Sequence, residues 1–159
     1  TSAGWHGGAV FHTDGLLRLS HATVANNSAP GGTTGGIFVG TFGPGGAQAE
    51  LLGSVLAGNS GDQCLRGFFG PGPVSITSLG GNLASDGTCV LDAAGDQAGA
   101  DPLLGSLSDN GGASATHALQ PGSPALDAAA GPTCPSTDQR GVGRPQGGGC
   151  DVGAFERAP

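Results

Sequence analysis

Three stretches of this chain can be laid on one another, and this repeat limits the fold more than any other feature of the sequence. Each stretch opens with apolar residues and ends at an asparagine. The stretches are residues 8–27, 36–59 and 64–82. Aligning the asparagines gives three columns of similar residues: Leu19, Leu51 and Val74; Val24, Leu56 and Leu79; and Asn27, Asn59 and Asn82. A unit of about 20 to 30 residues whose short strands cannot bury both faces alone needs stacked neighbours.

The pattern inside the units is that of strands. Residues 17–20 alternate apolar and polar side chains with a period of two, and the apolar runs are short and cut by glycine. Six prolines between Pro102 and Pro145 divide the second half into brief extended pieces. We therefore predict an all-β fold, a β-solenoid with little helix. The alternatives are a glycine-rich disordered linker and a β-sandwich with loose repeats.

Two further expectations follow from stacking the units. The asparagines are 32 and 23 residues apart, and we attribute the difference to an insertion at 41–46 in the middle unit. Asn27, Asn59 and Asn82 are expected to form a ladder that bridges the corners of adjacent units. Arg18 and Glu50 fall in register on the outside, as a cross-unit ion pair.

Composition narrows the classes of function. With 34 glycines and 11 prolines in 159 residues, the chain exceeds the share at which aperiodic sequences are usually disordered, so order must come from the repeat. Only 11% of residues are charged, lysine is absent and the net charge is −7, which argues against a nucleic-acid partner. No apolar run approaches the roughly 20 residues of a membrane span.

The four cysteines point to disulfides. Their number is even and no C-x-x-C pair occurs, which favours disulfides over zinc and a location outside the cytoplasm. Three pairings are open. The local ones, Cys64–Cys89 and Cys134–Cys150, are those we favour, and each closes a loop that could contribute about 3 kcal/mol.

The second half of the chain carries short motifs in a definite order. They occupy residues 81–89, 101–105, 109–112, 116–119, 121–128, 138–141, 144–145 and 150–156. This series resembles the choice-of-anchor Q type C-terminal domain of bacterial surface proteins, which are similar to polymorphic outer-membrane and adhesin-like repeat proteins. The resemblance covers nearly the whole chain.

The resemblance implies a right-handed parallel β-helix on a large exported protein, often followed by a separate sorting signal. We accordingly expect residues 1–90 to form three β-helix coils. Residues 91–159 should form family-specific C-terminal coils and a loop-rich, disulfide-stapled tail of the same folding unit. Compared with the family, we expect the chain to lack an anchor after residues 157–159 and to lack an N-terminal cap before its first coil.

An enzyme is the first alternative to a structural role. Right-handed β-helices include polysaccharide lyases, which need a base near the sugar C5 proton and a cation or arginine for the carboxylate. Asp14, Arg18 and Glu50 could share a face, but two opposite charges in register are more often a salt bridge. No nucleophile or nucleotide motif is present, so we expect no catalytic residues and keep lyase-like activity as the runner-up class.

Metal sites have little support. His6, His12, His21 and His117 show no metal spacing. His21 shares a column with Gly53 and Ile76 and is expected at a corner, whereas His117 is expected to be partly buried and hydrogen-bonded. Four acidic residues could hold Ca²⁺ as a cofactor, but turns in which aspartates cap backbone amides are the favoured interpretation. These residues are Asp92, Asp96, Asp101 and Asp109.

Charge is concentrated in the final segment, around the predicted Cys134–Cys150 loop. We interpret this group as a charged clasp that fixes an irregular tail, because arginine can bind carboxylates through two hydrogen bonds. Its members are Asp138, Arg140, Arg144, Asp151 and Glu156. Glycan binding by the same arginines is a weaker alternative.

Together these features predict a noncatalytic extracellular or cell-surface structural protein. An uncapped first coil exposes backbone donors and acceptors, so we expect a partner there. The partner is either the preceding coils of a parent chain or a second copy, and copies stacked head to tail would form a filament. The alternative is a polysaccharide-binding adhesin, for which Trp5, Phe68 and Phe69 offer aromatic platforms.

Overall fold

The protein is all-β. The computed structural model describes residues 8–129 and 134–159, and these residues contain no helix. Nine strands form three successive repeats. The first repeat comprises β1 (Val10–His12), β2 (Gly15–Ser20) and β3 (Thr23–Ala25); the second β4 (Thr34–Thr41), β5 (Ala47–Leu52) and β6 (Val55–Ala57); and the third β7 (Asp62–Phe68), β8 (Val74–Ser78) and β9 (Leu83–Ala84).

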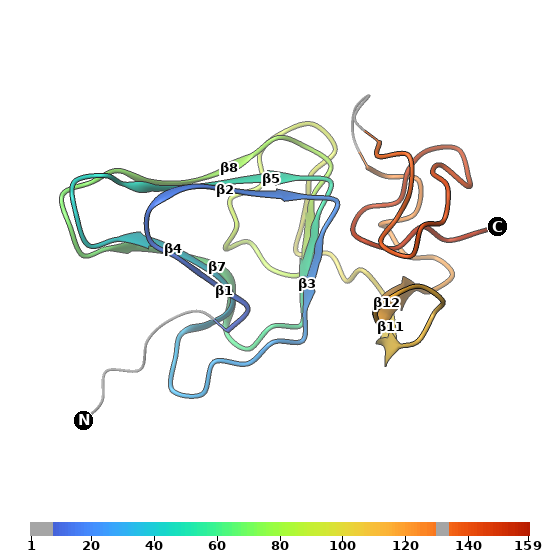
Figure 1. Ribbon diagram of the computed structural model, residues 1–159, viewed down its shortest axis with the longest axis horizontal. Coiled ribbons are helices and arrows are strands. Elements are labelled where there is room, and N and C mark those ends of the chain that lie inside the picture. The colour runs from blue at the N-terminus through green and yellow to red at the C-terminus, as the bar shows by residue number, and fades with distance from the viewer. Residues whose placement is uncertain (1–7, 130–133) are drawn as a thin grey trace.

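Each repeat contributes one strand to each of three parallel sheets. The strand orders are β1-β4-β7, β2-β5-β8 and β10-β9-β6-β3, where β10 (Gln97–Ala98) continues the third sheet. The chain thus passes through the three sheets in turn and returns to the first. In Figure 1 the repeats lie over one another around a common interior.

Alternation along the strands builds the core. In β5 the inward side chains of Ala47, Ala49 and Leu51 are buried, and those between them are more exposed. They join Ile37, Val39, Leu56 and other buried residues in one apolar cluster inside the repeats. Because neighbouring strands in a sheet are about 4.8 Å apart, like side chains stack directly from repeat to repeat.

The register confirms the first two predicted units and corrects the third. Leu19 pairs with Leu51, Val24 with Leu56 and Arg18 with Glu50. Leu51 and Leu56, however, continue to Ser78 and Ala84, so placing Val74 and Leu79 in those columns is wrong.

The cause of this error is the alignment of Asn82 with Asn59, which required an insertion in the second unit only. The connection 69–73 between β7 and β8 is as long as 42–46, and only the first repeat, with residues 13–14, is short. Val74 therefore lies opposite Ala47.

Glycine allows these longer connections to stack. The amide of Gly72 donates to the carbonyl of Gly43 at 3.0 Å, and a Cβ on Gly70 would lie 2.5 Å from the carbonyl carbon of Phe42. No side chain fits in so close a backbone contact.

After β10 the chain forms a C-terminal module, residues 99–129 and 134–159. It contains an antiparallel pair, β11 (Leu104–Ser108) and β12 (Thr116–Leu119), and long irregular segments. The module packs against the outer face of the third sheet through a second apolar cluster, which includes Val55, Leu83, Val152 and Phe155. The amide of Gly153 donates to the carbonyl of Gly53 at 2.7 Å. Figure 1 shows the module beside β3.

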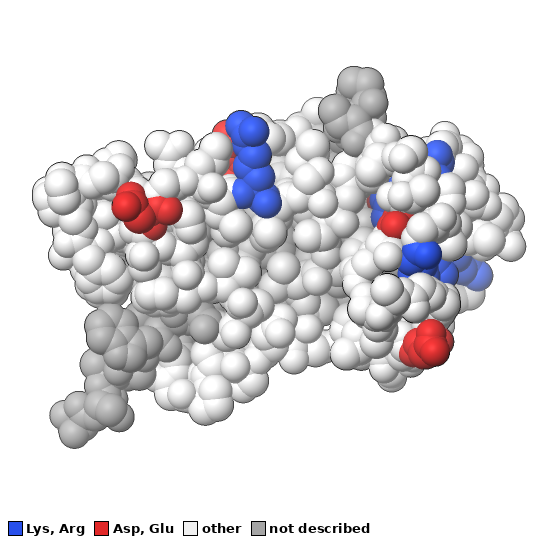
Figure 2. Space-filling view, viewed as in Figure 1, with Lys and Arg blue, Asp and Glu red and all other residues white. Residues whose placement is uncertain are grey.

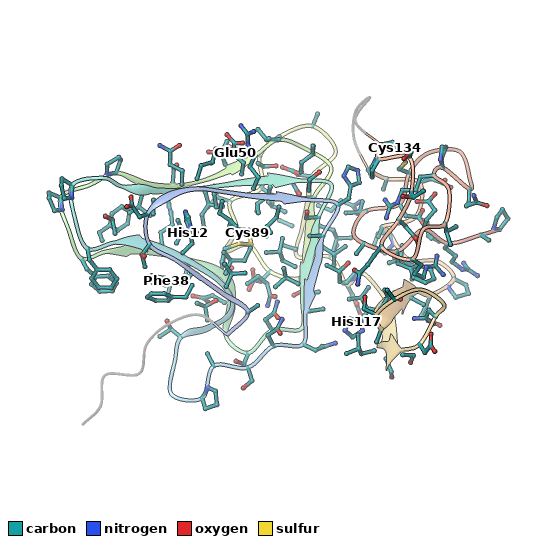
Figure 3. The ribbon with its side chains drawn as sticks, in the orientation of Figure 1. His12, Phe38, Glu50, Cys89, His117 and Cys134 are labelled. Atoms are coloured by element: carbon teal, nitrogen blue, oxygen red, sulfur yellow. A yellow bond between two sulfur atoms is a disulfide. The ribbon has the colours of Figure 1, made fainter. Side chains whose placement is uncertain are left out.

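Two disulfides are present, joining Cys64 to Cys89 and Cys134 to Cys150, the two pairs favoured by their spacing. The first ties β7 to the loop that follows β9. Figure 3 shows Cys89 inside the outline of the repeats, where it is buried in the core cluster. Stable disulfides are a feature of oxidising compartments, so they indicate a protein that is not cytoplasmic.

Candidate functional site

The two ends of the stacked repeats differ. At the third repeat the chain itself crosses the core: Cys89 is buried there and Leu91 packs beside it. The side chains of Asp86 and Thr88 accept hydrogen bonds from the amides of Gln63 and Cys64 at 3.1 Å. The loop of residues 85–96 therefore closes part of this end, as its course across the interior in Figure 1 shows.

The described residues of the first repeat form the opposite end of the stack, which we call the first-repeat edge. Leu19 and Val24 point into the core but are only partly buried, whereas their partners Leu51 and Leu56 in the second repeat are fully buried. Val10 and Leu17 are also only partly buried. Among residues 8–129 and 134–159, the apolar core thus extends to this end without a complete cover.

The backbone of β2 likewise has amides and carbonyls that can pair with a further strand. The amides of Gly15 and His21 donate to the second repeat, at Gly46 and Leu52. Since donors and acceptors alternate sides along a strand, Leu16, Arg18 and Ser20 direct their amides and carbonyls away from the second repeat. An edge of this kind is a template for strand pairing.

The predicted asparagine ladder exists for two of its three members. Oδ1 of Asn59 accepts hydrogen bonds from the backbone amide and Nδ2 of Asn27, both at 2.9 Å, and Nδ2 of Asn59 donates to the carbonyl of Val24. Each asparagine of this pair thus satisfies backbone groups at the corner after the third sheet.

Asn82 does not belong to this ladder, because it occupies a different corner. Its Oδ1 accepts from the amide of Ser54 at 2.9 Å, and Oγ of Ser54 accepts from the amide of Ala22 at 3.1 Å. The amide of Asn82 donates to Asp96 at 2.9 Å. This corner has its own ladder, in which each amide meets a side-chain oxygen of the following segment.

All five residues of the predicted clasp meet in the C-terminal module. Nη2 of Arg140 lies 2.7 Å from Oδ2 of Asp138, and Nε of Arg144 lies 3.6 Å from Oε2 of Glu156. Arg140 also lies over the ring of Phe155, with 3.6 Å between the guanidinium carbon and the ring centroid. We call this group, with Asp151, the charged cluster. Its three carboxylates and the Arg144 side chain are almost fully buried.

Backbone groups satisfy most of the charged cluster, although Nε of Arg144 has no hydrogen-bond partner among the described residues. Asp138 accepts hydrogen bonds from three amides, at Arg140, Val142 and Glu156. The two carboxylate oxygens of Glu156 accept from the amides of Gln146 and Asp151, at 2.8 and 3.0 Å. Arg144 donates to the carbonyls of Asp151 and Gly153. The cluster therefore organises irregular backbone, which is the structural role expected of a clasp.

Burial and hydrogen bonding act on its protonation in opposite directions. Burial alone would raise the pKa of Asp138, but hydrogen bonds from the Glu156 amide and from Arg140 outweigh it and hold this pKa below 3.8. Burial lowers the pKa of Arg144, while the charges of Glu156, Asp138 and Asp151 counter that shift.

His21 links the first repeat to the charged cluster. It lies at a corner beside Gly53, as expected, but not beside Ile76, which pairs with Ala49. A hollow of about 430 Å³ is lined by residues 20–23 and by residues of the module that include Arg144. Burial, and then the charge of Arg144, lower the pKa of His21 below 6.5. Sequence patterns gave no signal for this contact, because no periodicity connects positions so far apart.

His117 and the four weak calcium candidates are dispersed. Nδ1 of His117 is 2.7 Å from the carbonyl of Gly105, so this partly buried histidine is hydrogen-bonded as expected. Asp96, Asp101 and Asp109 accept hydrogen bonds from nearby backbone amides, and Asp92 does not join them. Over residues 8–129 and 134–159, no group of three or more histidine, cysteine or acidic side chains could hold a metal ion. His6 lies outside the described residues.

Phenylalanines gather on and beside the first sheet. The rings of Phe11 and Phe38 stack at 4.8 Å, and that of Phe69 stacks with Phe38 at 6.1 Å and with Phe42 at 5.2 Å. Phe38 points outward from its strand (Figure 3). Phe68 is 65% exposed and Phe69 55%. Trp5, the third predicted glycan contact, lies outside the described residues.

The proposed lyase face contains an ion pair. Nε of Arg18 is 2.6 Å from Oε2 of Glu50, and the arginine side chain is 70% exposed. Figure 2 shows few charged side chains over the repeats, with more of them over the C-terminal module. On this face, Arg18 and Glu50 thus pair with each other.

Among known proteins, no protein-family model, curated protein or solved structure matches the chain significantly. The described part of the chain also contains no helix long and apolar enough to cross a membrane.

Proposed function

We propose that this chain is a noncatalytic structural protein of the cell surface or extracellular space, built as a right-handed parallel β-helix that associates through its first repeat. The three parallel sheets, each with one strand per repeat, support the β-helix. The resemblance of residues 81–156 to the choice-of-anchor Q type domain supports a bacterial surface location. The disulfides fit secretion.

The first-repeat edge is the observation that carries the proposal. It combines partly exposed core residues with three strand edges whose amides and carbonyls are turned outward. A two-fold axis through the middle of β2 sets the β2 strands of two copies antiparallel to one another, edge to edge. The occupant we propose is therefore a second copy of the chain.

The loop of residues 85–96 limits how copies of the chain can assemble. Head-to-tail stacking into a fibre requires both ends of the repeats to be available, but this loop occupies part of the third-repeat end. Contact between two first-repeat edges is self-complementary and closes after two copies. We therefore expect a dimer as the main species.

Arg18→Pro tests the edge, with Arg18→Ala as the matched control. Both remove the ion pair with Glu50, but only proline removes the outward amide of the central β2 residue. Sedimentation velocity over a range of concentrations should show a dimer for the wild type and Arg18→Ala. Arg18→Pro should remain monomeric while keeping its β-type circular dichroism.

Other results decide against the proposal. A wild-type chain that stays monomeric at high concentration removes the self-association. Fibres in negative-stain micrographs would show that the third-repeat end is open and would overturn the dimer. Unsaturated products from pectin, alginate or glycosaminoglycans would replace the structural function with a lyase.

A further inference from the structure

The second and third repeats carry the same turn, and the first repeat lacks it. Phe42-Gly43-Pro44-Gly45 follows β4, and Phe69-Gly70-Pro71-Gly72 follows β7. The two turns stack, with their phenylalanine rings at 5.2 Å and 12° from parallel. In the first repeat only residues 13–14 join β1 to β2.

This difference in length leaves a hollow above the turn of the second repeat. Its volume is about 260 Å³, and it is lined by Thr13, Asp14, Thr41, Phe42 and residues 43–45. The size is just below the range of about 300–1,000 Å³ that is usual for small-molecule sites. One sugar-sized ring fits such a space, and a longer molecule must extend out of it.

The lining combines an aromatic ring with oxygen acceptors. Phe42 is 49% exposed, and Asp14 is an exposed carboxylate. Oδ1 of Asp14 lies over the turn, where a Cβ on Gly45 would be only 2.8 Å from it. Glycine at position 45 thus leaves space for the carboxylate beside the turn.

This chemistry selects a class of ligand. The C–H face of a pyranose can pack on the electron-rich face of an aromatic ring, while its hydroxyls donate to a carboxylate. No basic side chain lines the hollow among the described residues, and the carboxylate repels anions. A purely apolar partner would leave the carboxylate of Asp14 desolvated.

We propose that this hollow, which we call the Phe42 notch, binds one neutral hexopyranose residue of a polysaccharide. The sugar ring packs on Phe42 and donates hydroxyl hydrogen bonds to Asp14, with the Thr13 hydroxyl at the rim. This binding goes beyond the structural function. Sugar binding requires only one copy of the chain, so it can be tested on the Arg18→Pro monomer. The result of that test does not depend on whether the proposed dimer exists.

The test is an NMR titration of the ¹⁵N-labelled chain with cellohexaose, mannohexaose and maltohexaose, and with oligogalacturonate as the acidic arm. At least one neutral oligosaccharide should shift the amides of Thr13, Asp14 and Gly43. Phe42→Ala and Asp14→Ala should each weaken that binding about tenfold or more. Asp14→Ala changes an exposed side chain, so it tests the site even if Phe42→Ala disturbs the turn.

Phe68→Ala is the matched control, because Phe68 is more exposed than Phe42 but does not line the notch. It should bind as the wild type does. The proposal is overturned if none of the three neutral oligosaccharides shifts these amides, if Asp14→Ala binds as well as the wild type, or if oligogalacturonate binds more tightly than all of them.

Discussion

The repeats and the C-terminal module are held together by different forces. In the repeats, side chains such as Ile37, Leu51 and Leu56 form an apolar core, and strands pair in register. In the module, strands are few and the buried interior includes Asp138, Asp151 and Glu156 with their arginines.

The difference shows two ways to order a chain rich in glycine. Periodic strands satisfy their backbone groups with one another, so their interior can be apolar. Irregular segments cannot do this, and buried carboxylates and guanidinium groups take over as acceptors and donors for the backbone. Burying these charges is costly unless every one is paired, which makes the module the more fragile region.

The largest expected loss of stability comes from Arg144→Ala in the module. It leaves the buried Glu156 without its cation and the carbonyls of Asp151 and Gly153 without donors. Breaking a buried charge pair from one side costs about 3–5 kcal/mol. Chemical denaturation should show this loss. A loss below about 1 kcal/mol would mean that the cluster does not hold the module together.

Leu51→Ala should come next, because Leu51 is fully buried in the core of the repeats. We expect a loss of about 3 kcal/mol from lost burial and the remaining cavity. Leu19→Ala, in the same column but at the first-repeat edge, should cost about half as much in the monomer. Urea unfolding of the Arg18→Pro monomer with each substitution gives the comparison. Equal losses would contradict an open first repeat.

Asn59→Ala should lower the free energy of unfolding by about 1–3 kcal/mol, since it strands the amide of Asn27 and the carbonyl of Val24. Asn27→Ala is the matched control, because it removes the Nδ2 bonds to Asn59 and Ala25 but keeps the bonds from Asn59 to the Asn27 amide and the Val24 carbonyl. Thermal unfolding should place it between the wild type and Asn59→Ala. An Asn59→Ala variant as stable as the wild type would show that the corner ladder is dispensable.

The protein should lose stability in mild acid because of His21, which lies where the two regions meet. The pKa of His21 is lowered in the folded protein, so the unfolded chain binds more protons as the pH falls below 6.5. Stability is therefore full above that pH and declines as the pH falls through the folded pKa. Asp138 adds a separate loss below pH 3.8.

His21→Asn is the control for this pH dependence. Asparagine tolerates the positive φ of 49° at position 21 and does not titrate. Between pH 7 and 5, the free energy of unfolding should fall for the wild type and change less for the variant. The same pH dependence in both proteins would exclude His21 as the cause.

Arg18→Ala should have the smallest effect, at most about 1 kcal/mol, because its ion pair with Glu50 is exposed to solvent. Raising the salt concentration should reduce the difference from the wild type. A loss of stability as large as that of Arg144→Ala would contradict the comparison of the two regions. That comparison requires buried charge pairs to contribute more to stability than exposed ones.

Sequence patterns predicted much of the repeats and the members of the charged cluster. The shared spacing of 32 residues identified the partners of Leu19, Val24 and Arg18, because the side chains of stacked strands must match. The register of the third repeat could not be predicted in this way. Asparagine serves two different corners, so aligning Asn82 with Asn59 shifted the whole unit.

Contacts that depend on the path of irregular segments could not be predicted at all. The concentration of charge identified Arg144 and Glu156, but not their burial or the approach of His21. The Phe42 notch arises from a short connection in one repeat beside a long one in the next. Its position depends on the true register of the strands, which the alignment of the asparagines does not give.

Hydrogen–deuterium exchange at several protein concentrations tests the association through the first-repeat edge most directly. The account predicts that the amides of Leu16, Arg18 and Ser20 become more protected as concentration rises. Those of β5, which already pair within the chain, should not change. Exchange at these three amides that is fast and independent of concentration would contradict the association.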